Sequence, residues 1–120
     1  MTPDVLYHGS KVLVSVLEPL NGFVCAAHDR AVAIPFALVF RPDERGRSKW
    51  CLHMHPTDPR ISIEHGWLDT TGVGYLYRVT PDRFEDARYQ WLSREPVTPI
   101  GYEVIRGADY VSWISNGEAR

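Results

Sequence analysis

The sequence predicts an α+β fold with a core made mostly of strands. A series of short segments is rich in Val, Ile, Tyr and Trp and is punctuated by Pro, Gly, Asn or Asp, a pattern typical of strands and turns. By contrast, one segment alone has the length and apolar spacing of a clear helix. At 120 residues the chain can bury one hydrophobic core but not two, so residues 1–120 are expected to form a single domain.

The expected strands follow one another at short intervals along the whole chain, and turn-forming residues separate them. They are Val5–His8, Val12–Leu17, Phe23–Ala27, Trp50–His55, Arg60–Glu64, Gly74–Thr80, Tyr89–Ser93 and Pro99–Ile105. Short helices or turns are expected at Pro81–Ala87 and Ala108–Ile114.

The clear helix candidate runs from Asp29 to about Val39. Asp29 is a good N-cap because its carboxylate can accept hydrogen bonds from the first free N–H groups of a helix. Pro35 lacks an N–H and its ring clashes with the preceding turn, so the helix is expected to kink or to contain an irregular turn. The residues that would share its buried face are Ala31, Ile34 and Leu38.

Composition and charge narrow the class of protein. Hydrophobic residues make up 44% of the chain and charged residues 23%, as in ordinary globular proteins, and the net charge of −2 provides no general attraction to nucleic acid or anionic lipid. The longest apolar run, Ala31–Phe40, is too short to span a bilayer, and Met1–Asp4 does not look like a secretory signal. Cys25 and Cys51 form no CxxC pair. A reduced, cytoplasmic protein without membrane contact is therefore expected.

The most informative stretch is Val5–Ser10, a short apolar strand that ends in Tyr-His-Gly-Ser. Gly9 lets backbone N–H and C=O groups approach a ligand closely, and the His8 ring can offer a polar tip to a sugar hydroxyl. The segment Phe23–Ala27 then leads directly into the helix. A flat amide ring and a ribose can be held together by such an arrangement. The structural alternative is that His8 ends a strand with its ring hydrogen-bonded to backbone, while Phe23 lies in the core.

Further short motifs follow in a fixed order after Tyr-His-Gly-Ser and the Asp29-Arg-Ala junction. They are Gly74-Tyr-Leu-Tyr-Arg-Val79, Phe84-Glu85-Asp86 and Glu95-Pro-Val-Thr-Pro-Ile-Gly101. Taken together, residues 5 to 105 resemble the small bacterial ADP-ribosyltransferases. The rifamycin-inactivating enzymes are most similar in size and order of segments, while poly(ADP-ribose) polymerases and RNA 2′-phosphotransferases share the looser His-Gly pattern.

The resemblance implies a fold, an activity and a substrate. The fold would be an ADP-ribosyltransferase-like split, mostly antiparallel β-sheet with few short helices. The activity would be transfer of ADP-ribose from NAD, as substrate, to an acceptor macromolecule or small molecule, with release of nicotinamide. Toxin roles are common in this superfamily, so an antitoxin or regulatory protein is an expected class of partner.

The resemblance also assigns roles to residues of the first two motifs. His8 matches the histidine that binds the NAD ribose, and Gly9 matches the residue whose backbone pairs with the nicotinamide amide. Ser10 matches the neighbouring Ser or Thr. Tyr7 and Phe23 would flank the nicotinamide ring.

Three residues compete for the third motif, where the family usually has a carboxylate that stabilises the cationic sugar formed as nicotinamide leaves. Gln90 takes this place by strand position, Asp86 by loop position, and Glu95 lies nearest to the next strand. An amide can bond a ribose hydroxyl but supplies no charge and accepts no proton at neutral pH. A catalytically weak or inactive module that binds NAD or ADP-ribose is therefore the alternative function.

A second alternative from another class is a metal-dependent hydrolase or metal-binding domain centred on His53 and His55. On a strand, Cys51, His53 and His55 would point to one face because side chains alternate with a period of two. His65 is the other histidine near this segment, and no further ligand stands at a recognisable metal-site spacing.

Overall fold

The computed structural model describes residues 2–55, 58–88 and 90–120. The strands in this part of the chain are β1 (Leu6–Ser10), β2 (Val24–Ala26), β3 (Phe40–Arg41), β4 (Lys49–His55), β5 (Asp58–Leu68), β6 (Val73–Val79), β7 (Glu85–Asp86), β8 (Trp91–Ser93), β9 (Gly101–Arg106) and β10 (Ile114–Ala119). The helical segments are α1 (Arg30–Ala33) and the 3₁₀-helices η1 (Ile34–Ala37), η2 (Pro81–Arg83) and η3 (Gly107–Trp113).

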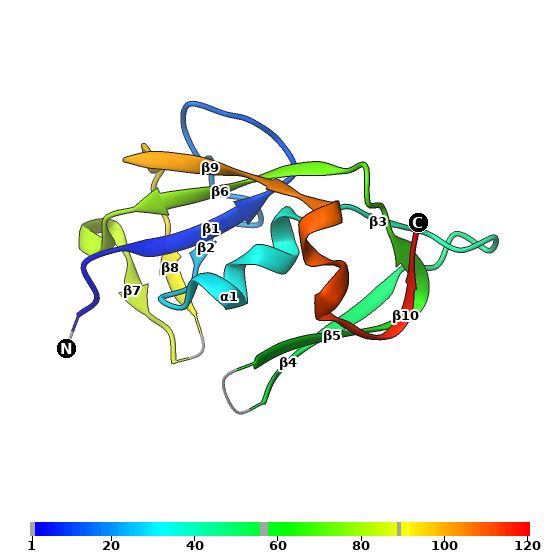
Figure 1. Cartoon of the computed structure of the whole chain (residues 1–120). Coiled ribbons are helices and arrows are strands. Elements are labelled where there is room, and N and C mark those ends of the chain that lie inside the picture. Colours follow the sequence, from blue (N-terminus) through cyan, green and yellow to red (C-terminus); the bar gives the residue numbers. More distant parts are fainter. Residues whose placement is uncertain (1, 56–57, 89) are drawn as a thin grey trace.

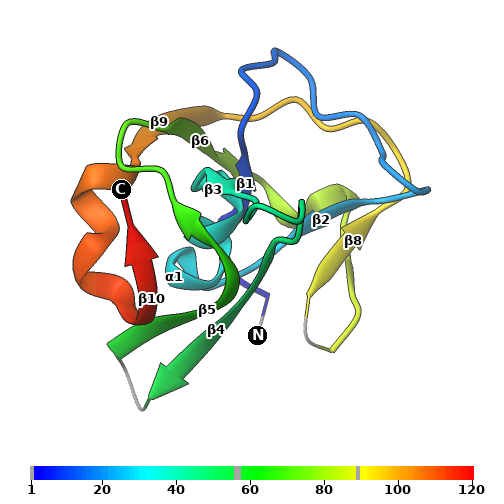
Figure 2. The ribbon, with the colours of Figure 1, turned by 90° about the vertical axis from the view of Figure 1, so that its right-hand side faces the viewer.

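The strands form three small sheets (Figures 1 and 2). One has the order β1–β6–β9, and a second has the order β10–β5–β3 with β4 also paired to β5. The third has the order β2–β8–β7. All neighbours are antiparallel except β10 and β5, which are parallel. The predicted α+β class with a mostly antiparallel strand core is therefore confirmed.

Most expected strands occur, with shifted ends. The first begins at Leu6 and continues to Ser10, and the strand expected at Arg60–Glu64 continues to Leu68. The strand expected at Tyr89–Ser93 is seen as β8, and Tyr89 itself lies outside the described residues. The segment expected at Pro81–Ala87 begins as the 3₁₀-helix η2 but continues into the two-residue strand β7, and the segment expected at Ala108–Ile114 is the 3₁₀-helix η3.

The strand predicted at Val12–Leu17 is wrong. Within it, Leu17 alone bridges another strand-like residue, Val97. The hydroxyl of Tyr77 donates to the Val12 carbonyl at 2.7 Å and accepts from the Val14 N–H at 2.8 Å. A buried side chain thus satisfies backbone groups that a neighbouring strand would otherwise have to pair. Conversely, the strands β3, β7 and β10 were not predicted.

The helix begins where predicted and ends earlier. Asp29 is the N-cap, and its carboxylate accepts from the Ala31 N–H at 2.9 Å. After the single α-helical turn of α1, the chain tightens into η1, whose second residue is Pro35. Proline has no N–H for the next α-helical hydrogen bond, so the irregular turn expected there is confirmed. Ile34 and Leu38 are fully buried, whereas Ala31 is half-buried.

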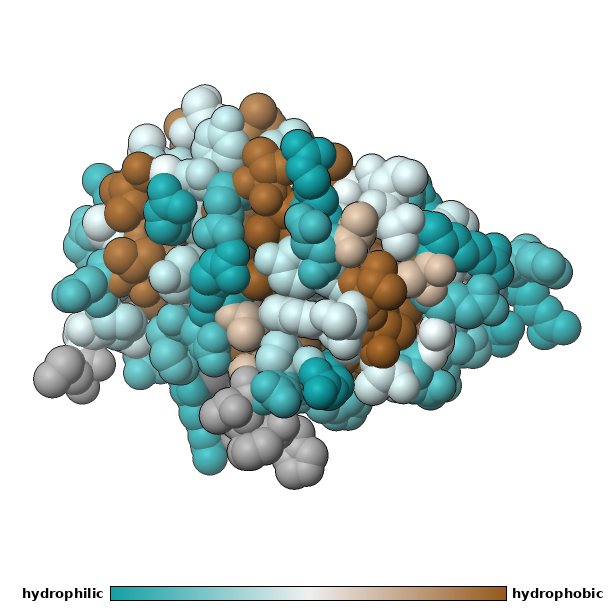
Figure 3. Space-filling model, viewed as in Figure 1, coloured by the Kyte–Doolittle hydropathy of each residue, from teal (hydrophilic) through white to brown (hydrophobic). Residues whose placement is uncertain are grey.

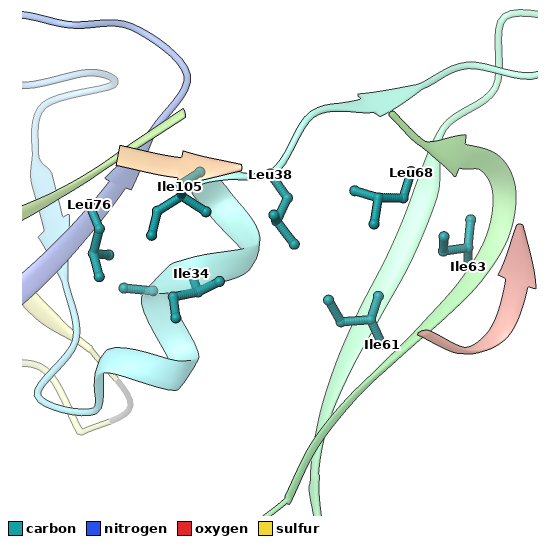
Figure 4. Packing of buried hydrophobic residues seen from close by; sticks show 9 residues of the cluster. Ile34, Leu38, Ile61, Ile63, Leu68, Leu76 and Ile105 are labelled. Carbon is teal, nitrogen blue, oxygen red and sulfur yellow. The ribbon is translucent and has the colours of Figure 1, made fainter. Parts of the chain in front are cut away.

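The helical segments lie between two sheets, and this layer forms the main core (Figure 4). Ile34 and Leu38 pack against Leu76 and Ile105 of one sheet and against β5 of the other. A second cluster covers the opposite face of the β1–β6–β9 sheet; it comprises Leu6, Leu17, Val24, Ala26, Tyr77, Val79, Phe84 and Val97. On the outside, Figure 3 shows polar and apolar residues interspersed over the viewed face. No helix of the described residues has the length and apolar character needed to cross a bilayer.

Asp69, in the turn between β5 and β6, gives the fold a pH-dependent stability. Its carboxylate accepts from the hydroxyl and the N–H of Thr71 at 2.7 and 2.9 Å and from Arg41 Nε at 2.9 Å. The Thr71 hydroxyl, followed by Arg41 and the Thr71 N–H, holds the pKa of Asp69 below its usual value. Because the folded pKa is lower than the unfolded one of about 3.9, this stabilisation is present above roughly pH 4 and is lost as pH falls further.

We therefore expect Asp69→Asn to lower the free energy of unfolding at pH 6 and to narrow its difference from wild type as pH falls below about 4. Urea unfolding at a series of pH values measures this. The exposed Asp4→Asn is the control and should follow the wild-type curve. A difference between wild type and Asp69→Asn that stayed constant from pH 6 to 3 would contradict the prediction.

Candidate functional site

A cleft opens where β1 and β2 separate. Tyr7 and Ala27 exchange two backbone hydrogen bonds, at 2.7 and 2.8 Å. Continued antiparallel pairing would place Cys25 opposite Gly9. The β1–β2 pairing is the single bridge Tyr7–Ala27, whereas Cys25 is paired to Leu92 of β8 on the other edge of β2, so β1 and β2 part after that bridge (Figure 2).

The parting of the strands leaves the backbone of Gly9 facing the gap. Residues two apart on a strand direct their N–H and C=O groups to the same side. Since Tyr7 directs its groups toward Ala27, Gly9 directs its own toward the side that β2 has left. No hydrogen bond to another described residue closes this edge. The strand therefore presents one donor and one acceptor side by side.

Gly9 also sets how closely the helical segments approach β1. A Cβ at this position would lie 2.2 Å from the carbonyl oxygen of Ala33 and 3.0 Å from the Cβ of Phe36. Only glycine permits this contact, because any larger residue would push α1 and η1 away from the strand. The same residue thus exposes a polar edge and brings the Phe36 segment beside it.

The cleft has a volume of about 290 Å³. It is lined by residues 7–9 of β1, residues 25–27 at the end of β2, Val32, Ala33 and Phe36 of the helical segments, and Gln90 before β8. Its walls are mainly apolar and aromatic. The polar side chains among these lining residues are those of Tyr7, His8, Cys25 and Gln90, and none of the lining residues is a carboxylate.

His8 is held at the cleft by its ring nitrogen. Nδ1 donates to the carbonyl oxygen of Cys25 at 2.5 Å, and the ring lies 6.3 Å from that of Tyr77. A carbonyl oxygen can only accept, so Nδ1 carries the hydrogen and Nε2 of the neutral ring is an acceptor. The hydrogen bond to backbone expected from the structural alternative is therefore present, and it leaves one acceptor nitrogen for a ligand.

Cys25 contributes a thiol rather than a thiolate to this cleft. Burial raises the pKa of the Cys25 thiol, because the apolar surroundings disfavour the charged form. The protonated sulfur is a weak nucleophile. Its part in the site is to form wall surface and, through its carbonyl, to orient His8.

Phe36 is the aromatic lining residue that the sequence analysis did not predict for the site. Its side chain is 55% exposed although it lies beside the main core, and its ring meets Trp50 of β4 edge-on, with centroids 5.3 Å apart. One signal was present in the sequence. Phe36 follows the buried Ile34 by two residues, so their side chains point about 200° apart around a helix. This spacing predicts that the Phe36 ring lies on the face away from the core.

The structure brings together four of the predicted site residues, Tyr7, His8, Gly9 and Gln90. Ser10 and Phe23 are not among the lining residues. The Ser10 hydroxyl accepts from the Val12 N–H at 3.1 Å. Phe23 bridges Leu20, and the guanidinium of Arg94 lies 5.7 Å from its ring centre.

Of the three candidates for the third motif, Gln90 alone lines the cleft. Asp86 lies in a separate depression and accepts from the Arg88 N–H at 2.9 Å. Glu95 accepts from Arg83 at 2.9 Å, in a pair that is exposed on both sides.

The histidines proposed for the metal alternative lie on β4, away from this cleft. Cys51 and His53 are exposed, and His53 is opposite Arg60 in the β4–β5 register. Among the described side chains, no three His, Cys, Asp or Glu residues gather in a group able to hold a metal ion. The side chain of His55 lies outside the described part.

Comparison with known proteins adds no assignment. A scan against protein-family models, a search of curated proteins and a search of solved structures each find no match to this chain.

Proposed function

We propose that the chain is an NAD-dependent ADP-ribosyltransferase that binds the nicotinamide end of NAD in the cleft between β1 and β2. The observation that carries the proposal is the open backbone edge of Gly9. A carboxamide carries one C=O and one NH₂ in a plane, so it complements a strand N–H and C=O that face the same gap. Nicotinamide has this group on a flat ring.

The walls and the size of the cleft support the same ligand. Tyr7 and Phe36 offer aromatic surface on which a flat ring can stack. A cleft of about 290 Å³ is near the lower limit of roughly 300 Å³ for pockets that enclose a drug-sized ligand. Nicotinamide and its ribose fit such a space, and the adenosine half of NAD would extend along the surface.

His8 and Gln90 supply the polar side chains for the ribose. In the proposed complex Nε2 of His8 accepts a hydrogen bond from a ribose hydroxyl, and Nδ1 stays bonded to the Cys25 carbonyl. The Gln90 amide bonds a second hydroxyl. In the transfer, the bond between ribose C1′ and the pyridinium nitrogen breaks, and neutral nicotinamide leaves with the bonding electrons. The acceptor forms a bond to C1′ and loses a proton to water.

One observation favours a second candidate function, a module that binds NAD or ADP-ribose without turnover. Gln90 is neutral, and no carboxylate is found among the described residues that line the cleft. The positive charge that develops on the ribose would then be stabilised only by dipoles, which are weaker than a carboxylate in the same place.

Calorimetric titration of NAD, with free nicotinamide measured in the same samples, tests both candidates. We expect NAD to bind and nicotinamide to accumulate slowly with water as acceptor. Gln90→Glu should raise the rate of release at least tenfold, about 1.4 kcal/mol in the barrier, because it adds a carboxylate beside the ribose.

Glu95→Gln is the matched control. It makes the reverse exchange of carboxylate for amide, at an ion pair outside the cleft, and should leave the rate of nicotinamide release unchanged. Failure of wild type to bind NAD would overturn the proposal. Binding without release, in wild type and in Gln90→Glu, would favour the second candidate.

A further inference from the structure

We infer that Trp50 is a positioning residue that holds Phe36 as a wall of the cleft and gives the site its preference for ligands with a flat ring. This inference rests on the proposed function and goes beyond it, because Trp50 is on β4 and does not line the cleft. It concerns which part of a dinucleotide the site recognises.

Phe36 has little support from its own segment. It belongs to η1, a 3₁₀-helix of four residues that contains Pro35 and ends at Ala37. Its neighbours Ile34, Pro35 and Ala37 are buried, but the Phe36 side chain is 55% exposed. A ring so exposed on a single short turn is free to change rotamer unless another side chain restricts it.

The Trp50 side chain, which contacts Phe36 but does not line the cleft, provides that restriction. The Phe36 and Trp50 rings meet at 69° with centroids 5.3 Å apart, an edge-to-face arrangement favoured by their quadrupoles. Trp50 in turn stacks on Phe40, at 5.2 Å and 17°. Phe40 pairs with Leu68 of β5, and Trp50 pairs with Ile63 of the same strand. The exposed Phe36 ring thus contacts Trp50, and both Trp50 and Phe40 belong to strands paired with β5. These contacts restrict the movement of the Phe36 ring.

This contact leaves a face of Phe36 available. An edge-to-face contact covers at most one face of either ring, and the remaining exposure of Phe36 agrees with this. The open face can stack on a nicotinamide ring. ADP-ribose lacks that ring and keeps the ribose and pyrophosphate. Trp50 should therefore contribute to binding of NAD and of free nicotinamide but not to binding of ADP-ribose.

The test compares three ligands in four proteins. Calorimetry gives the Kd of NAD, nicotinamide and ADP-ribose for wild type, Trp50→Leu, Trp50→Phe and Trp113→Leu. Trp113→Leu is the matched control. Trp113 is also partly buried against the main core and makes an edge-to-face pair, with Tyr110 at 5.0 Å and 85°, but it lies outside the cleft. Circular dichroism and thermal unfolding establish that each variant is folded.

We expect Trp50→Leu to weaken NAD and nicotinamide at least tenfold and ADP-ribose less than twofold. Trp50→Phe, which keeps an aromatic ring against Phe36, should recover most of the loss, and Trp113→Leu should change none of the three. Equal weakening of NAD and ADP-ribose binding by Trp50→Leu, or no weakening of either, would overturn the inference. The proposed function would still stand in that case, provided that wild type binds NAD. If Trp50→Leu does not fold, an unaltered ratio of the NAD and ADP-ribose Kd values in Phe36→Leu, which removes the ring that Trp50 is inferred to hold, overturns the inference. Wild type that binds none of the ligands would overturn the proposed function and this inference with it.

Discussion

Gly74→Ala should lower the free energy of unfolding by about 2–3 kcal/mol, as expected for inserting a methyl group into a well-packed core. Gly74 is buried on β6 and lies directly beneath η1. A Cβ there would lie 1.8 Å from the carbonyl oxygen of Ala37 and 2.6 Å from its carbonyl carbon. Backbone atoms cannot move aside as a flexible side chain can, so the whole of η1 would have to shift. Urea or thermal unfolding of the variant measures the loss.

Gly101→Ala is the matched control on the neighbouring strand β9. The nearest atoms to a Cβ at Gly101 belong to the guanidinium of Arg78, the mobile end of a long side chain. Removing a strand glycine also reduces the entropy of the unfolded chain, so we expect a change below about 1 kcal/mol in either direction. Equal losses for Gly74→Ala and Gly101→Ala would show that the approach of η1 to the sheet does not limit stability.

His8→Ala should weaken binding of both NAD and ADP-ribose at least tenfold, which corresponds to about 1.4 kcal/mol. The variant removes the Nε2 acceptor that the proposed complex offers to the ribose, and both ligands carry that ribose. It also leaves the Cys25 carbonyl without the ring N–H that it now accepts. An unpaired polar group at a bound interface costs about 1–3 kcal/mol, which sets the expected size of the effect. Calorimetric titration of the two ligands measures it.

His53→Ala is the control for this experiment and also bears on the metal alternative. His53 is an exposed histidine on β4, and it is not among the residues that line the cleft. We expect it to bind both ligands as wild type does. If His8→Ala binds NAD normally, the cleft is not the ribose site; if His53→Ala loses binding, the search for the site moves to β4.

Local sequence signals were enough to predict many elements. The Asp29 carboxylate can accept hydrogen bonds from the free N–H groups of a helix that follows it directly. The N-cap could therefore be predicted without knowledge of any tertiary contact. Pro35 predicted an irregular turn because its missing N–H is a covalent property. The short segments rich in Val, Ile, Tyr and Trp, separated by turn-forming residues, predicted most strands and hence the α+β class. The Tyr7–Gly9 motif drew attention to the segment that lines the cleft.

Other features depended on contacts between distant parts of the chain. Val12–Leu17 has the composition of a strand, but its backbone bonds to the Tyr77 hydroxyl, more than sixty residues away. β10 pairs with β5 in parallel, and no local sequence pattern predicts that pairing. Phe36 rather than Phe23 lines the cleft because of where η1 lies against Gly9 and Trp50.

The sequence by itself determined the Asp29 N-cap, the irregular turn at Pro35 and most of the strand-forming segments, because each of these depends on the covalent chemistry of a few adjacent residues. The tertiary structure alone decided which of the polar and aromatic candidates share one cleft. That choice depends on the parting of β1 from β2 and on the close packing of η1 against Gly9 and Gly74, where backbone meets backbone across separations of more than twenty residues.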